Sequence, residues 1–256
     1  VPLYRAVRES APRRAFLLGL LWGVSFYGLS LYWIFTAMHV YGEVPVWGSL
    51  LGVILLDLLF ALFIGGAMAL AARLRSPRIS FAIPFTLAWI AQDFLRNYFP
   101  FGGFAWSNLA YSQAAFLPMI QSADLTGVYG LTFLLLLTNA TIGERFPIKL
   151  FAVLLVLVAG DFLYGHFRMK GIEAGLSALP AKKIAIIQAN IPQDEKWQEE
   201  RVQESINRHI AMTEEVERQG VDLVVWPDDT KRPRFVYVGL EIPQPRHEIQ
   251  RRSYGR

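Results

Sequence analysis

The sequence contains no cysteine, which excludes disulfides, zinc–thiolate sites and a cysteine nucleophile within these 256 residues. Charged residues are also scarce. They make up 18% of the chain, whereas soluble globular domains contain about 25%. Hydrophobic residues account for 54% and are concentrated between Ala15 and Phe167. The composition therefore indicates an integral membrane protein with a soluble C-terminal part.

Common ligand-binding motifs are missing as well. The sequence has no P-loop and no Rossmann glycine pattern. Its four histidines form neither an i, i+4 pair nor a Ser/His/Asp arrangement, so no metal site and no cofactor are expected; they are His39, His166, His209 and His247. The net charge of +4 comes from residues 231–256, where seven Lys or Arg face two acidic residues. We predict that this segment is an unrelated, disordered basic tail, and that no nucleic acid is bound.

Five segments are apolar enough to be interpreted as membrane spans, at 15–35, 46–74, 81–95, 128–142 and 150–164. Residues 97–113 lie between the third and fourth spans and are rich in aromatics and glycine. This stretch is too polar to span and too apolar for a free loop, so it is interpreted as interfacial or re-entrant. Gly19, Gly23 and Gly28 in the first span suggest close helix approach.

The orientation follows from the distribution of Lys and Arg. Basic clusters occur at 5–14, 73–78 and 145–149, whereas the alternate loops at 36–45 and 97–113 contain neither residue. The positive-inside rule places the basic loops in the cytoplasm. With five spans, residue 170 and those after it would lie outside the cytoplasm.

Residues 182–229 have the pattern of a β-α-β unit. Two β-branched runs, at 184–187 and 222–226, flank an amphipathic helical segment that ends near Gly220. Its apolar face is predicted to contain Val202, Ile206, Ile210 and Val216. Such a unit implies two parallel strands joined by a crossover helix.

Polar residues follow each predicted strand and mark a candidate site. Asp228 comes directly after the second strand, and Asn190 and Gln193 follow the first, with Trp197 shortly beyond. The carboxyl ends of parallel strands share one edge, where ligands collect in α/β layers. A strand-end carboxylate can serve as a general base. Two adjacent acids can equally cap a turn, and a lone Trp more often packs than recognises a ligand.

These residues resemble the apolipoprotein N-acyltransferase family. The segment 184–197 and the Trp226-Pro227-acid sequence resemble the opening of that family's nitrilase-like domain. Three membrane segments match in the same order, at 28–33, 101–113 and 127–130. The similarity extends over about residues 1–230.

The resemblance implies a multi-pass α-helical membrane domain followed by a nitrilase-like α-β-β-α sandwich on the periplasmic side of the bacterial inner membrane. It implies transfer of an acyl chain from a phospholipid to the N-terminal amine of a diacylglyceryl-cysteine lipoprotein, through a thioester. In the family Glu acts as base, Lys stabilises the oxyanion and Cys is the nucleophile. Asp228 corresponds to the Glu, and Trp197 to a tryptophan tied to activity. Asn190, Gln193, Trp106 and Tyr111 are further expected substrate-binding residues.

The sequence also departs from the family pattern. Asp228 is one methylene shorter than Glu, so its carboxylate would fall about 1 Å or more short of a thiol placed for Glu. Misplacements of this size can lower the rate ~100-fold. No lysine and cysteine follow residue 230 in the family arrangement, and membrane segments are expected before Val1. The expectation is therefore a relative truncated at both ends that does not complete acyl transfer by itself.

The expected organisation is a transmembrane domain at 1–170, an incomplete nitrilase-like α/β domain at 171–230 and the tail at 231–256. The lipid bilayer, a phospholipid donor and the lipid-modified apolipoprotein are the expected partners. An alternative is a membrane binding or transport protein with an α/β appendage, which would use Asp57, Asp93 and Asp161. A lesser alternative, a nitrilase-like hydrolase on a membrane anchor, also needs a cysteine.

Overall fold

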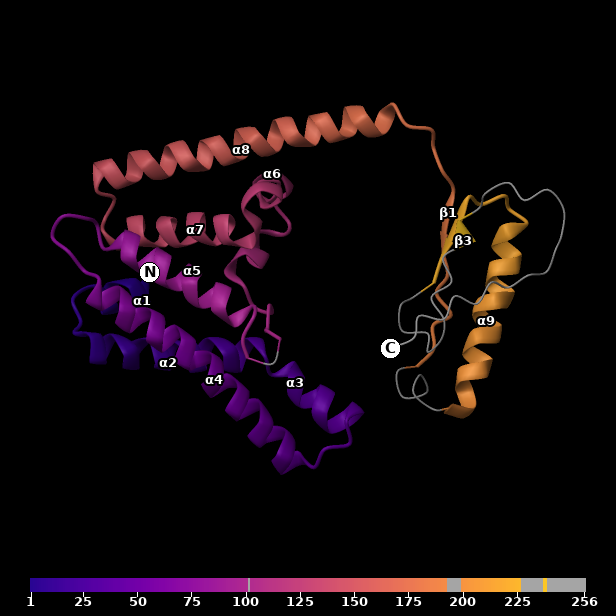
Figure 1. The fold of residues 1–256 in the computed structure, drawn as a ribbon, viewed down its shortest axis with the longest axis horizontal. Coiled ribbons are helices and arrows are strands. Elements are labelled where there is room, and N and C mark those ends of the chain that lie inside the picture. The colour runs from indigo at the N-terminus through magenta and orange to yellow at the C-terminus, as the bar shows by residue number, and fades with distance from the viewer. Residues whose placement is uncertain (101, 193–198, 227–236, 239–256) are drawn as a thin grey trace. The chain divides into compact units, whose positions relative to one another are not determined.

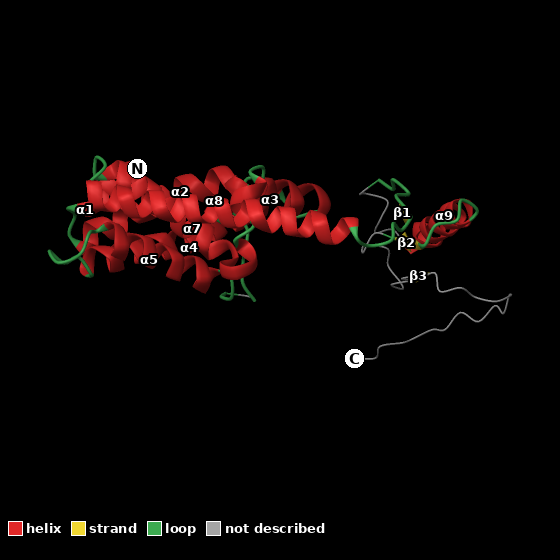
Figure 2. Ribbon diagram, turned by 90° about the horizontal axis from the view of Figure 1, so that it is seen from above, coloured by secondary structure: helices red, strands yellow, loops and turns green. Residues whose placement is uncertain are grey.

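The computed structural model describes residues 1–100, 102–192, 199–226 and 237–238. It divides into two compact units, Val1–Leu176 and Ser177–Arg256. The first unit is helical, and most of its helices pack against one another (Figures 1 and 2). In chain order they are α1 (Pro2–Arg8), α2 (Pro12–Ser30), α3 (Trp33–Thr36), η1 (Ala37–Tyr41), α4 (Val46–Arg73), α5 (Ala82–Arg96), η2 (Leu109–Gln113), α6 (Leu117–Ile120), α7 (Ala123–Gly143) and α8 (Ile148–Ser177).

Three helices of the described chain are long and apolar enough to cross a membrane, namely α4, α7 and α8. A fourth crossing is possible if α2 and the segment Trp33–Tyr41, bent by 50°, form one span. About five spans were expected. The expected third span is α5, which has only 15 residues, fewer than the roughly 20 that a bilayer requires. The chain is therefore a membrane protein whose α5 is too short to cross by itself.

Two further boundaries differ from the sequence-based expectation. Helix α7 begins earlier than expected and is broken at Gly127, which has φ 60° and ψ −161°. Helix α8 continues to Ser177, past both the expected end of the fifth span at residue 164 and the expected domain boundary at residue 170. Gly171 and Gly175 do not end the helix, because a glycine weakens a helix by only about 1 kcal/mol.

Helices α2 and α4 approach closely through small residues. A methyl group on Gly23 would lie 2.7 Å from the Ala61 Cα, and one on Gly19 would lie 2.7 Å from the Met68 Cγ. These two predicted close approaches are confirmed. Gly28 lies near the Asp57 carboxylate, because a methyl group there would be 3.4 Å from Oδ2. In a bilayer no hydrophobic effect drives helices together, so their association depends on close backbone packing, which small residues allow.

The basic connections meet at one end of the bundle. The Arg75 side chain donates to the Ser10 carbonyl oxygen. The Tyr4 and Ser80 hydroxyls both donate to Glu144 Oε1. These contacts join the segments before α2, after α4 and after α7. One shared basic end is what the positive-inside rule requires of these loops.

The second unit contains the predicted β-α-β arrangement. Strands β1 (Ile184–Ile186) and β2 (Leu223–Val225) pair in parallel, and α9 (Glu199–Glu217) lies between them in the chain. A third strand, β3 (Tyr237–Val238), pairs antiparallel with β2. Gly220 has φ +67°, as expected just past a helix end. The described sheet has three short strands, so the nitrilase-like sandwich stays a prediction.

The buried face of α9 differs in part from the predicted one. Ile206 and Val216 are half-buried, but Ile210 is 43% exposed. His209 and Thr213 are buried in its place. The apolar spacing predicted the helix correctly and its packed face only in part.

Candidate functional site

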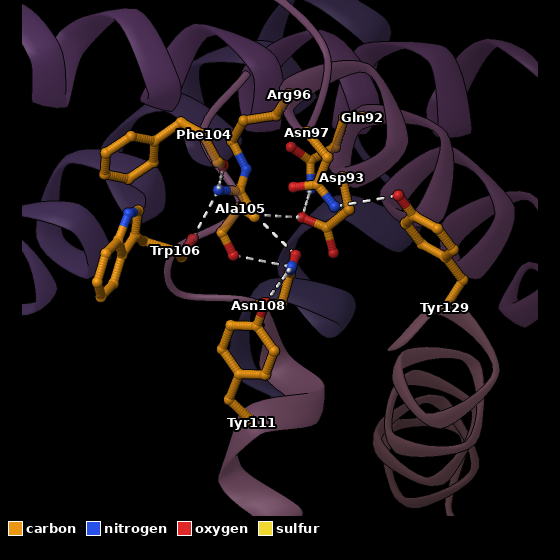
Figure 3. A network of polar contacts seen from close by, with 10 residues as sticks. All are labelled: Gln92, Asp93, Arg96, Asn97, Phe104, Ala105, Trp106, Asn108, Tyr111 and Tyr129. Carbon is orange, nitrogen blue, oxygen red and sulfur yellow. Dashed lines mark hydrogen bonds and ion pairs between the residues drawn. The ribbon is translucent and has the colours of Figure 1, made fainter. Parts of the chain in front are cut away.

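Arg96 forms the centre of a polar network at the end of α5 (Figure 3). Its side chain is fully buried. Nη1 donates to the carbonyl oxygens of Phe104 and Trp106, at 2.6 Å each. Nη2 donates to Asp93 Oδ1 at 3.1 Å and to Asn108 Oδ1 at 2.8 Å. Four of the five guanidinium N–H groups are thus used within the chain.

Asn108 extends this network along the loop. Its Nδ2 donates to the Ala105 carbonyl oxygen at 3.0 Å and more weakly to the Tyr111 hydroxyl at 3.4 Å. Asn97, at the start of the loop, donates to the Tyr129 hydroxyl on α7 at 3.0 Å. The loop is therefore held by α7 at its start and by its own Asn108 contacts further along.

The loop also needs a glycine at its tightest point. Gly103 has φ +97°, and an added methyl group would lie 2.0 Å from the Asn97 carbonyl oxygen. No side chain fits there, because the left-handed conformation and the close backbone both exclude it. The next residue, Phe104, donates its backbone N–H to the Arg96 carbonyl oxygen at 2.8 Å.

Aromatic rings surround the guanidinium on the bundle side. Its carbon lies 5.8 Å from the Tyr27 ring centroid and 6.0 Å from that of Phe60. Phe104 stacks on Phe60 with centroids 4.6 Å apart. The loop therefore enters the bundle beside α4, which agrees with a re-entrant segment.

Other aromatic side chains of this region point outward. Trp106 is 59% exposed and Tyr111 is 49% exposed. The Trp106 ring lies 5.3 Å from that of Trp33, in α3. The arrangement thus combines a buried charge network with an exposed indole pair. The exposed indoles offer apolar and N–H contacts, and residues 97–113 contain no Lys, Arg, Asp or Glu.

The second candidate site lies in the second unit and is only partly described. Asn190 follows β1, is exposed and has φ 48°. Trp226 follows β2, and the parallel register Ile186↔Val225 puts both at the same sheet edge. Gln193, Trp197 and Asp228 lie outside the described residues, so their proximity stays a prediction.

Trp226 packs against α9 beneath this edge. Its indole N–H donates to Thr213 Oγ1 at 2.9 Å, and its ring lies 5.2 Å from that of His209. His209 uses Nδ1 in a contact with the Ser205 carbonyl oxygen at 2.7 Å. These contacts hold the residue that directly precedes Pro227.

The three membrane acids of the transport alternative have different surroundings. Asp93 pairs with Arg96. Asp57 is buried in α4, and Asp161 lies in the long helix α8. Over the described residues, no three His, Cys, Asp or Glu side chains are close enough to hold a metal ion.

Sequence reasoning missed Arg96, Asn108 and Thr213. Arg96 carried a usable signal, since it is the only Lys or Arg between Arg78 and Arg145 and follows Asp93 by three residues on a helix. Asn108 and Thr213 carried no comparable signal, because their partners are chosen by tertiary packing.

Comparisons with known proteins give a consistent result. The family model described as "Apolipoprotein N-acyltransferase N-terminal domain" matches residues 1–141. Proteins named apolipoprotein N-acyltransferase are similar over most of the chain. The one from Geobacter metallireducens is 35% identical over 89% of this chain and 45% of its own length. The one from Chromobacterium violaceum is 30% identical over 89% and 44%. The one from Methylococcus capsulatus is 28% identical over 99% and 50%. The chain thus spans about half the length of these curated relatives.

Proposed function

Because this chain belongs to the apolipoprotein N-acyltransferase family, we propose that it serves the N-acylation of lipoproteins in the bacterial inner membrane. In this reaction an acyl chain passes from a phospholipid to the N-terminal amine of a diacylglyceryl-cysteine lipoprotein. The observation that carries the proposal is the family match over residues 1–141, which includes Arg96 and the whole loop 97–113.

The two units would contribute differently to this reaction. The membrane unit would present the phospholipid donor through Trp106 and Tyr111. The soluble unit would be an incomplete nitrilase-like domain on the periplasmic side, with Asn190, Gln193 and Trp197 toward the substrate and Asp228 at the position of the family's general base. The parallel β1–β2 pair supports this proposal, since its carboxyl edge is where a catalytic acid belongs.

The proposed orientation can be tested by labelling, since the chain contains no cysteine. A single cysteine at Lys149, in the basic end, is expected to resist a membrane-impermeant maleimide added from the periplasm. One at Ser177, past the apolar part of α8, is expected to react. The reverse result would contradict the orientation.

The thioester of the family reaction cannot form on these 256 residues, because none is cysteine. We therefore expect the chain alone to show no transfer from radiolabelled phospholipid to a diacylglyceryl peptide. Turnover by the purified chain would contradict this expectation.

The function itself is tested with a chimera in which residues 1–230 replace the matching stretch of the Geobacter metallireducens relative. With Asp228 changed to Glu, the chimera is expected to acylate the peptide. Trp106→Ala should lower its activity about tenfold, since truncating an important contact residue costs more than about 1 kcal/mol. Phe146→Ala serves as the matched control, because it removes an exposed aromatic ring beyond the C-terminus of α7. A chimera that inserts and folds but transfers nothing, beside an active parent enzyme, would refute the proposal.

A further inference from the structure

We propose that Arg96 is the positioning residue of a preformed aromatic platform, consisting of Trp33 and Trp106, that receives phospholipid without using headgroup charge. This inference deepens the proposed function and rests on it for its biological meaning. Two physical claims are independent of acyl transfer. The Arg96 guanidinium holds the loop 97–113 in place, and Trp33 and Trp106 contact lipid.

The loop depends on Arg96 because two carbonyl groups of the loop point toward the guanidinium. The guanidinium binds the carbonyl oxygens of Phe104 and Trp106, and Trp106 is one of the exposed indoles. Carbonyl groups without donors at membrane depth cost several kcal/mol each. Irregular backbone is tolerated there only when protein groups satisfy it. The Arg96 side chain supplies those donors from inside the bundle.

A lysine cannot replace this guanidinium. Arginine offers a rigid planar fork with five N–H donors, whereas lysine offers one ammonium on a flexible stem. The four acceptors come from two stretches of chain, Asp93 in α5 and three residues of the loop, namely Phe104, Trp106 and Asn108. Only a planar fork reaches them at once.

The same geometry excludes a headgroup role for Arg96. Its side chain is fully buried, both Nη atoms are occupied, and Asp93 balances the charge. Residues 97–113 contain no Lys, Arg, Asp or Glu. The platform therefore meets lipid through indole faces and N–H groups, which favour the interfacial region of a bilayer. Its partner is the glycerol-ester region that phospholipids share.

The first experiment measures the loop in the full chain, reconstituted in phospholipid nanodiscs. Because the chain has no cysteine, spin labels can be placed at Ser112→Cys in the loop and Leu62→Cys on α4. The parent should give a narrow distance distribution. Arg96→Lys should broaden it about twofold, since an ammonium has three N–H donors and cannot serve all four acceptors at once. Asn108→Ala keeps the Arg96–Asp93 pair and should broaden it less. Arg75→Lys, an exposed arginine at the basic end, is the matched control and should change nothing.

A parental width in both Arg96→Lys and Asn108→Ala would overturn the positioning role. If Arg96→Lys does not fold, Asn108→Ala decides the question, because it leaves the buried ion pair intact.

The second experiment measures lipid contact by quenching with brominated lipids, taking the difference between parent and Trp106→Phe as the Trp106 signal. Quenching should be equal, within about twofold, for brominated phosphatidylcholine and phosphatidylglycerol, because residues 97–113 contain no Lys, Arg, Asp or Glu. A strong preference for phosphatidylglycerol, or no Trp106 quenching at all, would overturn the platform. Neither experiment involves acyl transfer, so their failure is distinguishable from failure of the chimera.

Discussion

Replacing Gly23 with valine is expected to separate α2 from α4. The first added carbon would lie 2.7 Å from the Ala61 Cα and 2.9 Å from its Cβ. Carbon atoms in contact prefer about 3.5–4.0 Å, so the helices must move apart by about 1 Å. Because backbone blocks the site, no rotamer change relieves the clash.

The cost follows from this geometry. Overpacking a close-packed site costs about 1–3 kcal/mol, and valine adds two further carbons beyond the blocked position. We therefore expect a loss near 3 kcal/mol, or about 100-fold in the folding equilibrium. Valine is a slightly better helix former than glycine, which offsets a few tenths of a kcal/mol.

The assay is reversible unfolding in mixed detergent micelles, followed by far-UV circular dichroism. Gly66→Val is the matched control, because Gly66 lies in α4 with nothing within 4 Å of an added Cβ. Gly66→Val should leave the free energy of unfolding nearly unchanged. Adding Ala61→Gly to Gly23→Val should recover part of the loss, since one of the two close contacts disappears. Equal shifts for Gly23→Val and Gly66→Val would refute the reasoning, because helix contact would then not be the cause.

Two further predictions concern the second unit. The Lys183 backbone N–H and the Lys182 ammonium lower the pKa of Asp222. The carboxylate therefore adds stability above its unfolded pKa of about 4 and loses it as the pH falls through the lowered value. Asp222→Asn should remove that acid dependence from thermal melts, and an unchanged pH profile would contradict it. Thr213→Val removes the acceptor of the Trp226 indole N–H. This should cost about 1 kcal/mol and speed amide exchange in α9 about fivefold; unchanged exchange would contradict the role of this bond.

Local signals explain how the membrane class, the β-α-β unit and the end of α9 could be predicted. Long uncharged runs need lipid or a core whatever their partners are. The period of apolar residues indicates helix or strand within a single element. Gly220 predicts a helix end, because its backbone conformation suits a residue without a side chain. For the same reason, a few short segments were enough to indicate the family resemblance.

Tertiary structure decided which residues meet. Arg96 could be predicted as the end of a span, but three of its four acceptors lie eight, ten and twelve residues later in the loop. The spacing of apolar residues predicted helix α9 correctly. Packing against Trp226, however, buried His209 and Thr213 and left Ile210 exposed. Sequence patterns report the preferences of one element at a time. Buried polar groups take the partner that folding brings within hydrogen-bond reach, and only the packed chain determines that partner.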